Sequence, residues 1–306
     1  MDGGIDDALA LILALSSPEL EVAGITTVSG NVPVDQATIN GLQVVELLDR
    51  RDVWVARGLA NPLVRDVVRA TIFHGKDGMG DSRLPLPKTR PAAKGALDAI
   101  SDALRTSKRR EITLVCTGPL TNMAALLTGF PDVSKKVREL VIMGGAYGVT
   151  EYGIGNETPV AEFNIYSDPE AAKIVFESGV PLKAIGLDVT MLPESQLTQQ
   201  EYTRIKKGKG RIASFAAKIL RKNMRKHGQF ALHDPMAVAV TVKPSFFEFA
   251  RRGVQIETRG EHTAGMTVAD RRNLPENKLL GERALICKGV DSRGFKRLLL
   301  DRLTDS

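Results

Sequence analysis

Three aspartates lie among the first seven residues, directly before the apolar run ALALILAL. Asp2 is separated from Asp6 and Asp7 by a segment that contains Gly3 and Gly4. A carboxylate at a helix start is explained by N-capping and by the helix dipole, which stabilises it by about 0.3–1 kcal/mol. That explanation covers one or two of the three side chains. Clustered carboxylates repel one another, and a hard cation such as Ca²⁺ or Mg²⁺ would offset the repulsion. The spacing leaves both interpretations open, a charged helix start and a metal site.

A second group is the dipeptide His233-Asp234 in FALHDPMAVAV, at the start of an apolar run of helical character. One interpretation is an aspartate N-cap followed by Pro235 at the first helical position. The other is a metal-ligating aspartate beside a histidine that acts as an acid. An isolated histidine can equally be a buried residue with satisfied hydrogen bonds. The pair alone does not decide between these interpretations.

The segment GNETPVAEFNIYSDPEAA, residues 155–172, is rich in amide and carboxylate side chains. Asn156, Glu162 and Asn164 offer donors and acceptors that match the vicinal hydroxyls of a sugar. The alternative is a capped loop, with Asp168 and the proline after it at the start of the next helix. Both interpretations stay open for this segment.

Short apolar segments alternate with segments of helical period along most of the chain. This alternation is typical of βαβ units and predicts an α/β fold with an open, mostly parallel central sheet flanked by helices. Strands are expected within residues 22–30, 111–118, 139–145 and 181–190 and in three segments after 250, with helices near 35–49, from about 120 and near 292–304. No repeat or linker divides the sequence, so residues 1–306 are interpreted as one domain.

Ligands bind beyond the carboxyl ends of the strands in sheets of this kind. Several expected strands are followed by polar residues, namely Asn31, Thr117, the residues after Met143, and Asp188. We expect the site to lie where these residues meet.

The charge distribution argues against nucleic acid as a partner. The net charge is +6, but ten of the 42 basic residues lie between Arg204 and Lys226, where there is no acidic residue. Without them the chain would hold 32 basic and 36 acidic residues, a net charge of −4. The basic segment lacks the interleaved aromatic residues of a base-stacking surface, so it is interpreted as a solvated helix face.

No segment resembles a membrane span or a disulfide framework. The apolar stretch at residues 8–15 is far shorter than the roughly 18 residues that a membrane helix needs. The residues before it are acidic, unlike those of a signal peptide, so a cytoplasmic location is expected. Cys116 and Cys287 lie far apart in the sequence and are expected to be buried thiols.

Taken together, these segments resemble the nucleoside hydrolase family, the inosine-uridine preferring N-ribohydrolases. The strings that carry the resemblance are, in order, DGGIDDALALILAL, TTVSGN, CTGPLTNMA, VIMGGA, AEFNIYSDPEAA and LHDP. The resemblance implies an open α/β fold, a Ca²⁺ ion at the floor of the active site, and hydrolysis of ribonucleosides to ribose and free base. It also implies a small-molecule substrate, a homodimer or homotetramer, and a role in nucleoside salvage or catabolism.

The resemblance also assigns roles to individual residues. It implies that Asp2, Asp7, Asp234 and the backbone carbonyl of Thr117 ligate Ca²⁺, and that Asp2 is the general base on the metal-bound water. His233 in the LHDP context would protonate or steer the departing base. The substrate would be held by Asp6, Asn31, His74, Met143, Asn156, Glu162 and Asn164. His227 is assigned to the substrate as well.

The sequence departs from the family pattern in two places. Family members begin with an apolar strand that leads into D-x-D-P-G-x-D-D, whereas this sequence begins inside that motif, with Gly3 where proline is usual. We therefore expect the first strand to be missing and Asp2 to lie on a frayed terminus. In residues 221–230 related enzymes often place a tyrosine, and His227, Gln229 and Phe230 stand there instead.

Two other functions were weighed. A catalytically silent relative that binds a nucleoside or ribose is the main alternative, because it would need no intact metal site. A metal-dependent phosphohydrolase is disfavoured, because the sequence has no phosphate-binding loop of the G-x-x-x-x-G-K-[ST] kind.

Overall fold

Six strands in the computed structural model form one sheet, in the order β3-β4-β5-β10-β8-β9. The structure describes residues 1–272, 274–275, 278 and 280–304. The strands are β3 (Thr113–Cys116), β4 (Glu139–Met143), β5 (Leu182–Ile185), β8 (Phe247–Ile256), β9 (Thr267–Ala269) and β10 (Glu282–Val290). β3, β4, β5 and β10 run parallel, whereas β8 pairs antiparallel with β10 and with β9. The predicted mostly parallel central sheet is confirmed.

Two smaller sheets accompany the central one. β1 (Gly24–Thr26) pairs parallel with β2 (Trp54–Ala56), and β6 (Leu197–Thr198) pairs antiparallel with β7 (Gln229–Phe230). The backbone of Met1 lies beside β1. Its amino group donates to Thr26 O at 3.1 Å, and Val28 N donates to Met1 O at 3.0 Å. These bonds hold the first residue of the chain against β1 and the residues that follow it.

Alternate residues of β4 face opposite sides of the sheet, as the two-residue period of a strand requires. Val141 and Met143 belong to one apolar cluster, and Leu140 and Ile142 belong to another. All four are buried. Helices cover both faces of a parallel sheet, and this explains why the strand consists of a continuous apolar run instead of an alternating pattern.

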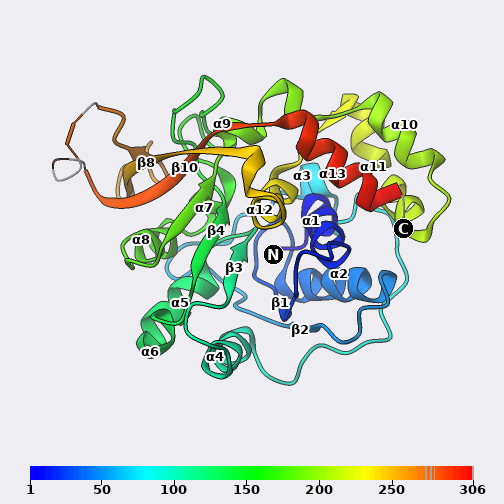
Figure 1. Ribbon diagram of the computed structural model, residues 1–306, viewed down its shortest axis with the longest axis horizontal. Coiled ribbons are helices and arrows are strands. Elements are labelled where there is room, and N and C mark those ends of the chain that lie inside the picture. Colours follow the sequence, from blue (N-terminus) through cyan, green and yellow to red (C-terminus); the bar gives the residue numbers. More distant parts are fainter. Residues whose placement is uncertain (273, 276–277, 279, 305–306) are drawn as a thin grey trace.

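The helices divide between the two clusters, and Figure 1 shows them on the two sides of the sheet. The helices of the first cluster are α1 (Ile5–Leu15), α2 (Val34–Leu47), α10 (Gln199–Lys207), α11 (Arg211–His227), α12 (His233–Val242) and α13 (Ser292–Thr304). The helices of the second are α4 (Ala96–Thr106), α5 (Thr121–Gly129) and α8 (Pro169–Phe176). Shorter helices are α3 (Thr71–His74), α6 (Pro131–Ser134), α7 (Phe163–Ser167) and α9 (Leu187–Thr190), with 3₁₀ turns at Pro193–Ser195 and Pro244–Phe246.

The residues after the parallel strands meet at one edge of the sheet. Thr117 follows β3, Met143 ends β4, and Asp188 lies just beyond β5. The carboxylate of Asp188 is engaged by backbone amides, with Tyr147 N at 2.8 Å and Val149 N at 2.7 Å. Asp188 therefore fixes the loop after β4.

Every helix among the described residues is too short or too polar to span a bilayer.

Candidate active site

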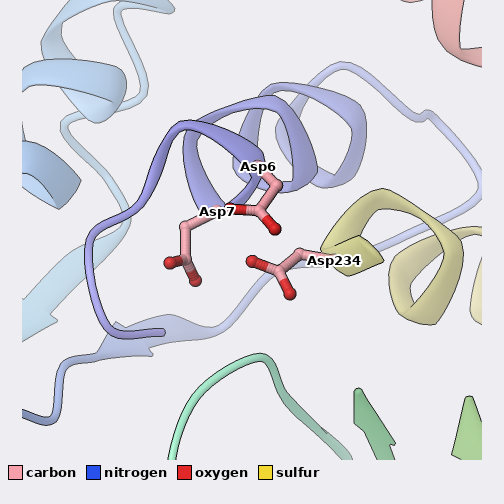
Figure 2. A group of neighbouring side chains, drawn as sticks. All are labelled: Asp6, Asp7 and Asp234. Atoms are coloured by element: carbon pink, nitrogen blue, oxygen red, sulfur yellow. The ribbon is translucent and has the colours of Figure 1, made fainter. Parts of the chain in front are cut away.

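Three aspartate side chains from two helices converge at the site. Figure 2 shows Asp6 and Asp7 at the start of α1 and Asp234 at the start of α12, with their carboxylates close together. One oxygen of each lies within 4.8 Å of the others, and all three residues are buried. We call these three residues the acidic cluster. The hydroxyl of Thr117 donates to Asp7 Oδ1 at 2.7 Å, which places the acidic cluster beside the carboxyl end of β3.

Asp7 is the firmly held member of the acidic cluster. Its Oδ2 accepts from Gly4 N at 2.8 Å, and its Oδ1 accepts from Asp2 N at 3.3 Å in addition to the Thr117 hydroxyl. Gly4 is the N-cap of α1, so Asp7 closes the first turn from the third helical position. Helix capping accounts for Asp7 and leaves Asp6 unexplained.

Asp6 and Asp234 each bury one oxygen that has no hydrogen-bond partner among the described residues, Oδ1 in Asp6 and Oδ2 in Asp234. Burial and the charge of Asp7 raise the pKa of Asp6 to about 8. Burial, followed by the charges of the other aspartates, raises the pKa of Asp234 well above its usual range. Buried oxygens without donors are costly unless a cation or proton satisfies them. The acidic cluster therefore fits a hard cation.

The interpretation of Asp234 as an N-cap is wrong. Leu232 is the N-cap of α12, and no side-chain hydrogen bond caps the helix. Asp234 lies inside the first turn, where the helix dipole favours a negative charge. Its carboxylate is directed into the acidic cluster instead of back onto the backbone (Figure 2).

Asp2 lies beside the acidic cluster and is fully buried. Its carboxylate accepts from Asn31 N at 2.7 Å and from Asn31 Nδ2 at 2.8 Å. Gly30 packs so closely that a Cβ at that position would lie 2.0 Å from Asp2 Oδ2. Burial, followed by the charge of Asp7, raises the pKa of Asp2 well above its usual range. The expectation that Asp2 lies on a frayed terminus is wrong, because these contacts fix its side chain.

Two histidines lie close to the acidic cluster. His74 Nδ1 accepts from Ile5 N at 3.1 Å and lies 3.7 Å from Asp6 Oδ1. A 2.8 Å hydrogen bond joins His233 Nδ1 to the hydroxyl of Thr190. Burial lowers the pKa of both imidazoles to about 4, and the charge of His74 contributes to the shift of His233. Both rings are therefore neutral at neutral pH.

Glu162, Asn164 and Met143 form the part of the site built from the loops after β4. Glu162 is the N-cap of α7, and its carboxylate accepts from the amides of Asn164 and two other residues. Asn164 Nδ2 donates to Met143 O at 3.1 Å. Burial raises the pKa of Glu162, and its charge contributes to the raised pKa of Asp6. The interpretation of this segment as a capped loop is confirmed, because Asp168 caps α8 by accepting from Ala171 N, with Pro169 at the first helical position. Contact of Glu162 and Asn164 with sugar hydroxyls stays a prediction.

Comparisons with known proteins bear on what this site does. Residues 1–297 match the family described as inosine-uridine preferring nucleoside hydrolase. The chain belongs to this family. It is 41% identical over 309 residues to the pyrimidine-specific ribonucleoside hydrolase RihA of Salmonella schwarzengrund. The alignment covers 99% of this chain and 96% of that relative. RihA of Citrobacter koseri is 40% identical over 309 residues, and that alignment also covers 99% of this chain and 96% of the relative.

Solved structures give the same result. A plant nucleoside hydrolase superposes with a TM-score of 0.90 and 31% identity, covering 100% of this chain and 98% of that one. A purine-preferring ribonucleoside hydrolase from Gardnerella vaginalis superposes with a TM-score of 0.87 and 32% identity, covering 100% and 96%. The protein is thus a ribonucleoside hydrolase, an enzyme that cleaves the bond between ribose and base.

Two residues assigned to the substrate are exposed in this nucleoside hydrolase. Asn156 is exposed, and its Oδ1 accepts from Phe163 N at 3.0 Å. His227 is the exposed last residue of α11. Among the described contacts, none joins either side chain to the acidic cluster. Their assignment to the substrate stays a prediction.

Sequence reasoning missed two residues that support the hydrolase site. Asn40 on α2 is buried, and its Nδ2 donates to Gly3 O at 2.7 Å and to Asp77 O at 2.8 Å. Arg69 donates from Nη1 to Gly30 O at 3.1 Å and to a neighbouring hydroxyl. Asn40 fixes the turn before α1, and Arg69 braces the loop against Asp2. No local pattern distinguishes either residue from a solvated one, so sequence alone offered no signal.

Proposed function

We propose that this enzyme is a Ca²⁺-dependent ribonucleoside hydrolase whose ion is held by Asp7, Asp234, Asp2 and the backbone carbonyl of Thr117. The observation that carries the proposal is the convergence of the buried carboxylates of the acidic cluster, in which one oxygen of Asp6 and one of Asp234 lack a hydrogen-bond donor among the described residues. An all-oxygen donor set suits Ca²⁺ or Mg²⁺ and disfavours zinc. When bound, such an ion supplies positive charge that acidifies water and attracts hydroxyl oxygens.

Asp2 is the proposed general base and Asp6 the proposed ribose ligand. Asp7 and Asp234 belong to the acidic cluster and are also proposed metal ligands. Asp6 is the third residue of the acidic cluster, whereas Asp2 is the third aspartate among the proposed ligands. Asp2 supports the role of base because Asn31 fixes its carboxylate and because its pKa is raised, which improves a carboxylate as a proton acceptor. The proton of the attacking water would pass to an Asp2 carboxylate oxygen.

The ribose is proposed to lie between the acidic cluster and the residues after β4, in contact with Asn31, Met143, Asn156, Glu162 and Asn164. Glu162 and Asn164 are buried and fixed by hydrogen bonds, so their polar groups are preorganised for hydroxyls. Carboxylates around the sugar would also stabilise the positive charge of an oxocarbenium-like transition state.

His233 is proposed to assist departure of the base, with His74 near the base. Thr190 fixes the His233 ring through Nδ1, which leaves Nε2 for the substrate. Because the pKa of His233 is lowered to about 4, the ring acts as a neutral hydrogen-bond donor to the departing base at neutral pH. The matching relatives differ in base preference, pyrimidine-specific for RihA and purine-preferring for the Gardnerella vaginalis enzyme.

The test is release of ribose from uridine, cytidine, inosine and adenosine by the 306-residue chain, with and without a Ca²⁺ chelator. We expect release that the chelator abolishes and that added Ca²⁺ restores. Release that persists in chelator would refute the metal dependence. A folded chain that binds nucleosides without releasing ribose would favour the silent relative, against which the fixed position of Asp2 argues.

A homodimer or homotetramer, a cytoplasmic location and a role in nucleoside salvage are proposed with this function. Light scattering of the purified protein would check the oligomeric state. A purely monomeric protein would contradict that part of the proposal.

A further inference from the structure

An open cavity, none of whose lining residues belongs to the acidic cluster, lies between strands β8 and β10 and the loop after β4. Its volume is about 160 Å³, and it is lined by Gly148, Val149, Ala250, Arg252, Arg271 and Lys288. β8 and β10 run side by side (Figure 1). In their antiparallel pairing Arg252 lies opposite Ala284. We call this the basic cavity, because three of its six lining residues are cationic.

The charges of the basic cavity are poorly compensated. Arg271 Nη1 donates to Gly148 O at 2.6 Å, and Arg252 Nη1 donates to Arg251 O at 3.1 Å. Among the described residues, Glu248 is the acidic group that pairs with one of the three cations, at 3.4 Å from Lys288 Nζ. The Nε of Arg252 is buried without a hydrogen-bond partner in the described part of the chain. A buried donor of a charged group is costly to leave unpaired.

The wall of the basic cavity is preorganised. Val149 N donates to Asp188 Oδ1 at 2.7 Å, and the Tyr147 amide donates to the other carboxylate oxygen at 2.8 Å. The contact of Arg271 with Gly148 fastens the same loop from the other side. A ligand would therefore order little additional chain on binding, which favours affinity.

We propose that the basic cavity binds a small oxyanion of the phosphate class, held by Arg252, Arg271 and Lys288. Guanidinium groups match the geometry of phosphate oxygens, and a bound anion would offset the charge of the three cations. The cavity is open and has a volume of about 160 Å³, which is space enough for phosphate or the head of a phosphate monoester.

The test is calorimetric titration of the full, chelator-treated chain with sodium phosphate at constant ionic strength. Chelation removes any ion that would itself attract phosphate. We expect one saturable site, weakened roughly ten-fold or more by Arg252→Gln and by Lys288→Gln. The matched control is Arg251→Gln, because residue 251 is exposed and points to the opposite face of β8. It should leave the affinity unchanged.

A second titration with ribose 5-phosphate distinguishes free phosphate from a phosphate monoester as the natural ligand. Tighter binding of phosphate identifies the free anion, and tighter binding of ribose 5-phosphate identifies a monoester. Thermal unfolding verifies that each variant is folded. Absence of a saturable site in the folded chain would overturn the proposal. Equal weakening by Arg251→Gln, or equal binding of chloride, would overturn it as well, because either result describes non-specific charge attraction.

Discussion

Replacing Asp234 by asparagine should stabilise the metal-free enzyme while removing its response to Ca²⁺. Asp234 is buried, its Oδ2 has no partner among the described residues, and it faces Asp6 and Asp7. Asparagine keeps the size of the side chain and removes its charge. Repulsion within the acidic cluster therefore falls, but a proposed ligand of the ion is lost.

The magnitude follows from the separation of the charges. Two unit charges 4.8 Å apart repel by about 3.5 kcal/mol at an effective dielectric constant of about 20. Only the pair of Asp7 and Asp234 is counted, because burial and Asp7 raise the pKa of Asp6 to about 8. The repulsion is an upper limit at pH 7, because burial and the neighbouring aspartates also raise the pKa of Asp234 well above its usual range. An incompletely paired amide costs about 1 kcal/mol in return. The free energy of unfolding should rise, by at most about 2.5 kcal/mol.

This gain can be expressed as a melting temperature. An unfolding entropy of about 2.1 cal/mol/K per residue over 306 residues converts this upper limit of the gain to about 4 °C. Thermal unfolding in chelator should show an increase up to that limit for Asp234→Asn. Addition of Ca²⁺ should raise the melting temperature of the wild-type enzyme and leave that of the variant unchanged, because the ion stabilises only the form that binds it.

The matched control is Asp168→Asn. Asp168 is also buried, but its carboxylate accepts from Leu63 N, Ala171 N and the Thr121 hydroxyl, outside the acidic cluster. This variant should lose stability and keep the response to Ca²⁺. If Asp234→Asn lowers the metal-free melting temperature, or retains the wild-type response to Ca²⁺, the reasoning from charge repulsion is wrong.

Three further predictions concern residues around the acidic cluster. His233→Ala should slow hydrolysis of natural nucleosides much more than that of nitrophenyl riboside, whose leaving group needs no assistance, and equal losses on both would exclude this role. Gly30→Ala should lower kcat by about 100-fold or more, since its Cβ would displace the Asp2 carboxylate, whereas Gly129→Ala, with nothing within 4 Å, should keep full activity. Asn40→Ala should lower the free energy of unfolding by about 2 kcal/mol, because two backbone carbonyls lose their donor; an unchanged urea midpoint would contradict this.

Local sequence patterns determined the arrangement of layers. The apolar run of β4 predicts a strand buried on both faces, and the alternation with helical segments predicts a parallel sheet whose carboxyl ends gather the ligand-binding residues. The closing helix expected near 292–304 is observed at Ser292–Thr304. These features are predictable because hydrophobic periodicity is a local property of the chain.

The motifs also indicated the chemistry. Six strings in one order, from DGGIDDALALILAL to LHDP, were enough to recognise the family, which the comparisons confirm. The reaction followed from this resemblance, because each group of residues by itself left a structural interpretation open.

Only the tertiary structure decided which of these side chains retain free oxygens. Asp188 has the position of a site residue after β5, yet backbone amides occupy its carboxylate, whereas Asp234 has the sequence context of a helix cap and faces the acidic cluster. Asn40 supports the turn before α1 from a helix remote in sequence. Such contacts depend on where distant segments pack, and no local period encodes that packing. The sequence therefore specified the functional groups, and long-range packing decided which of them meet in the acidic cluster.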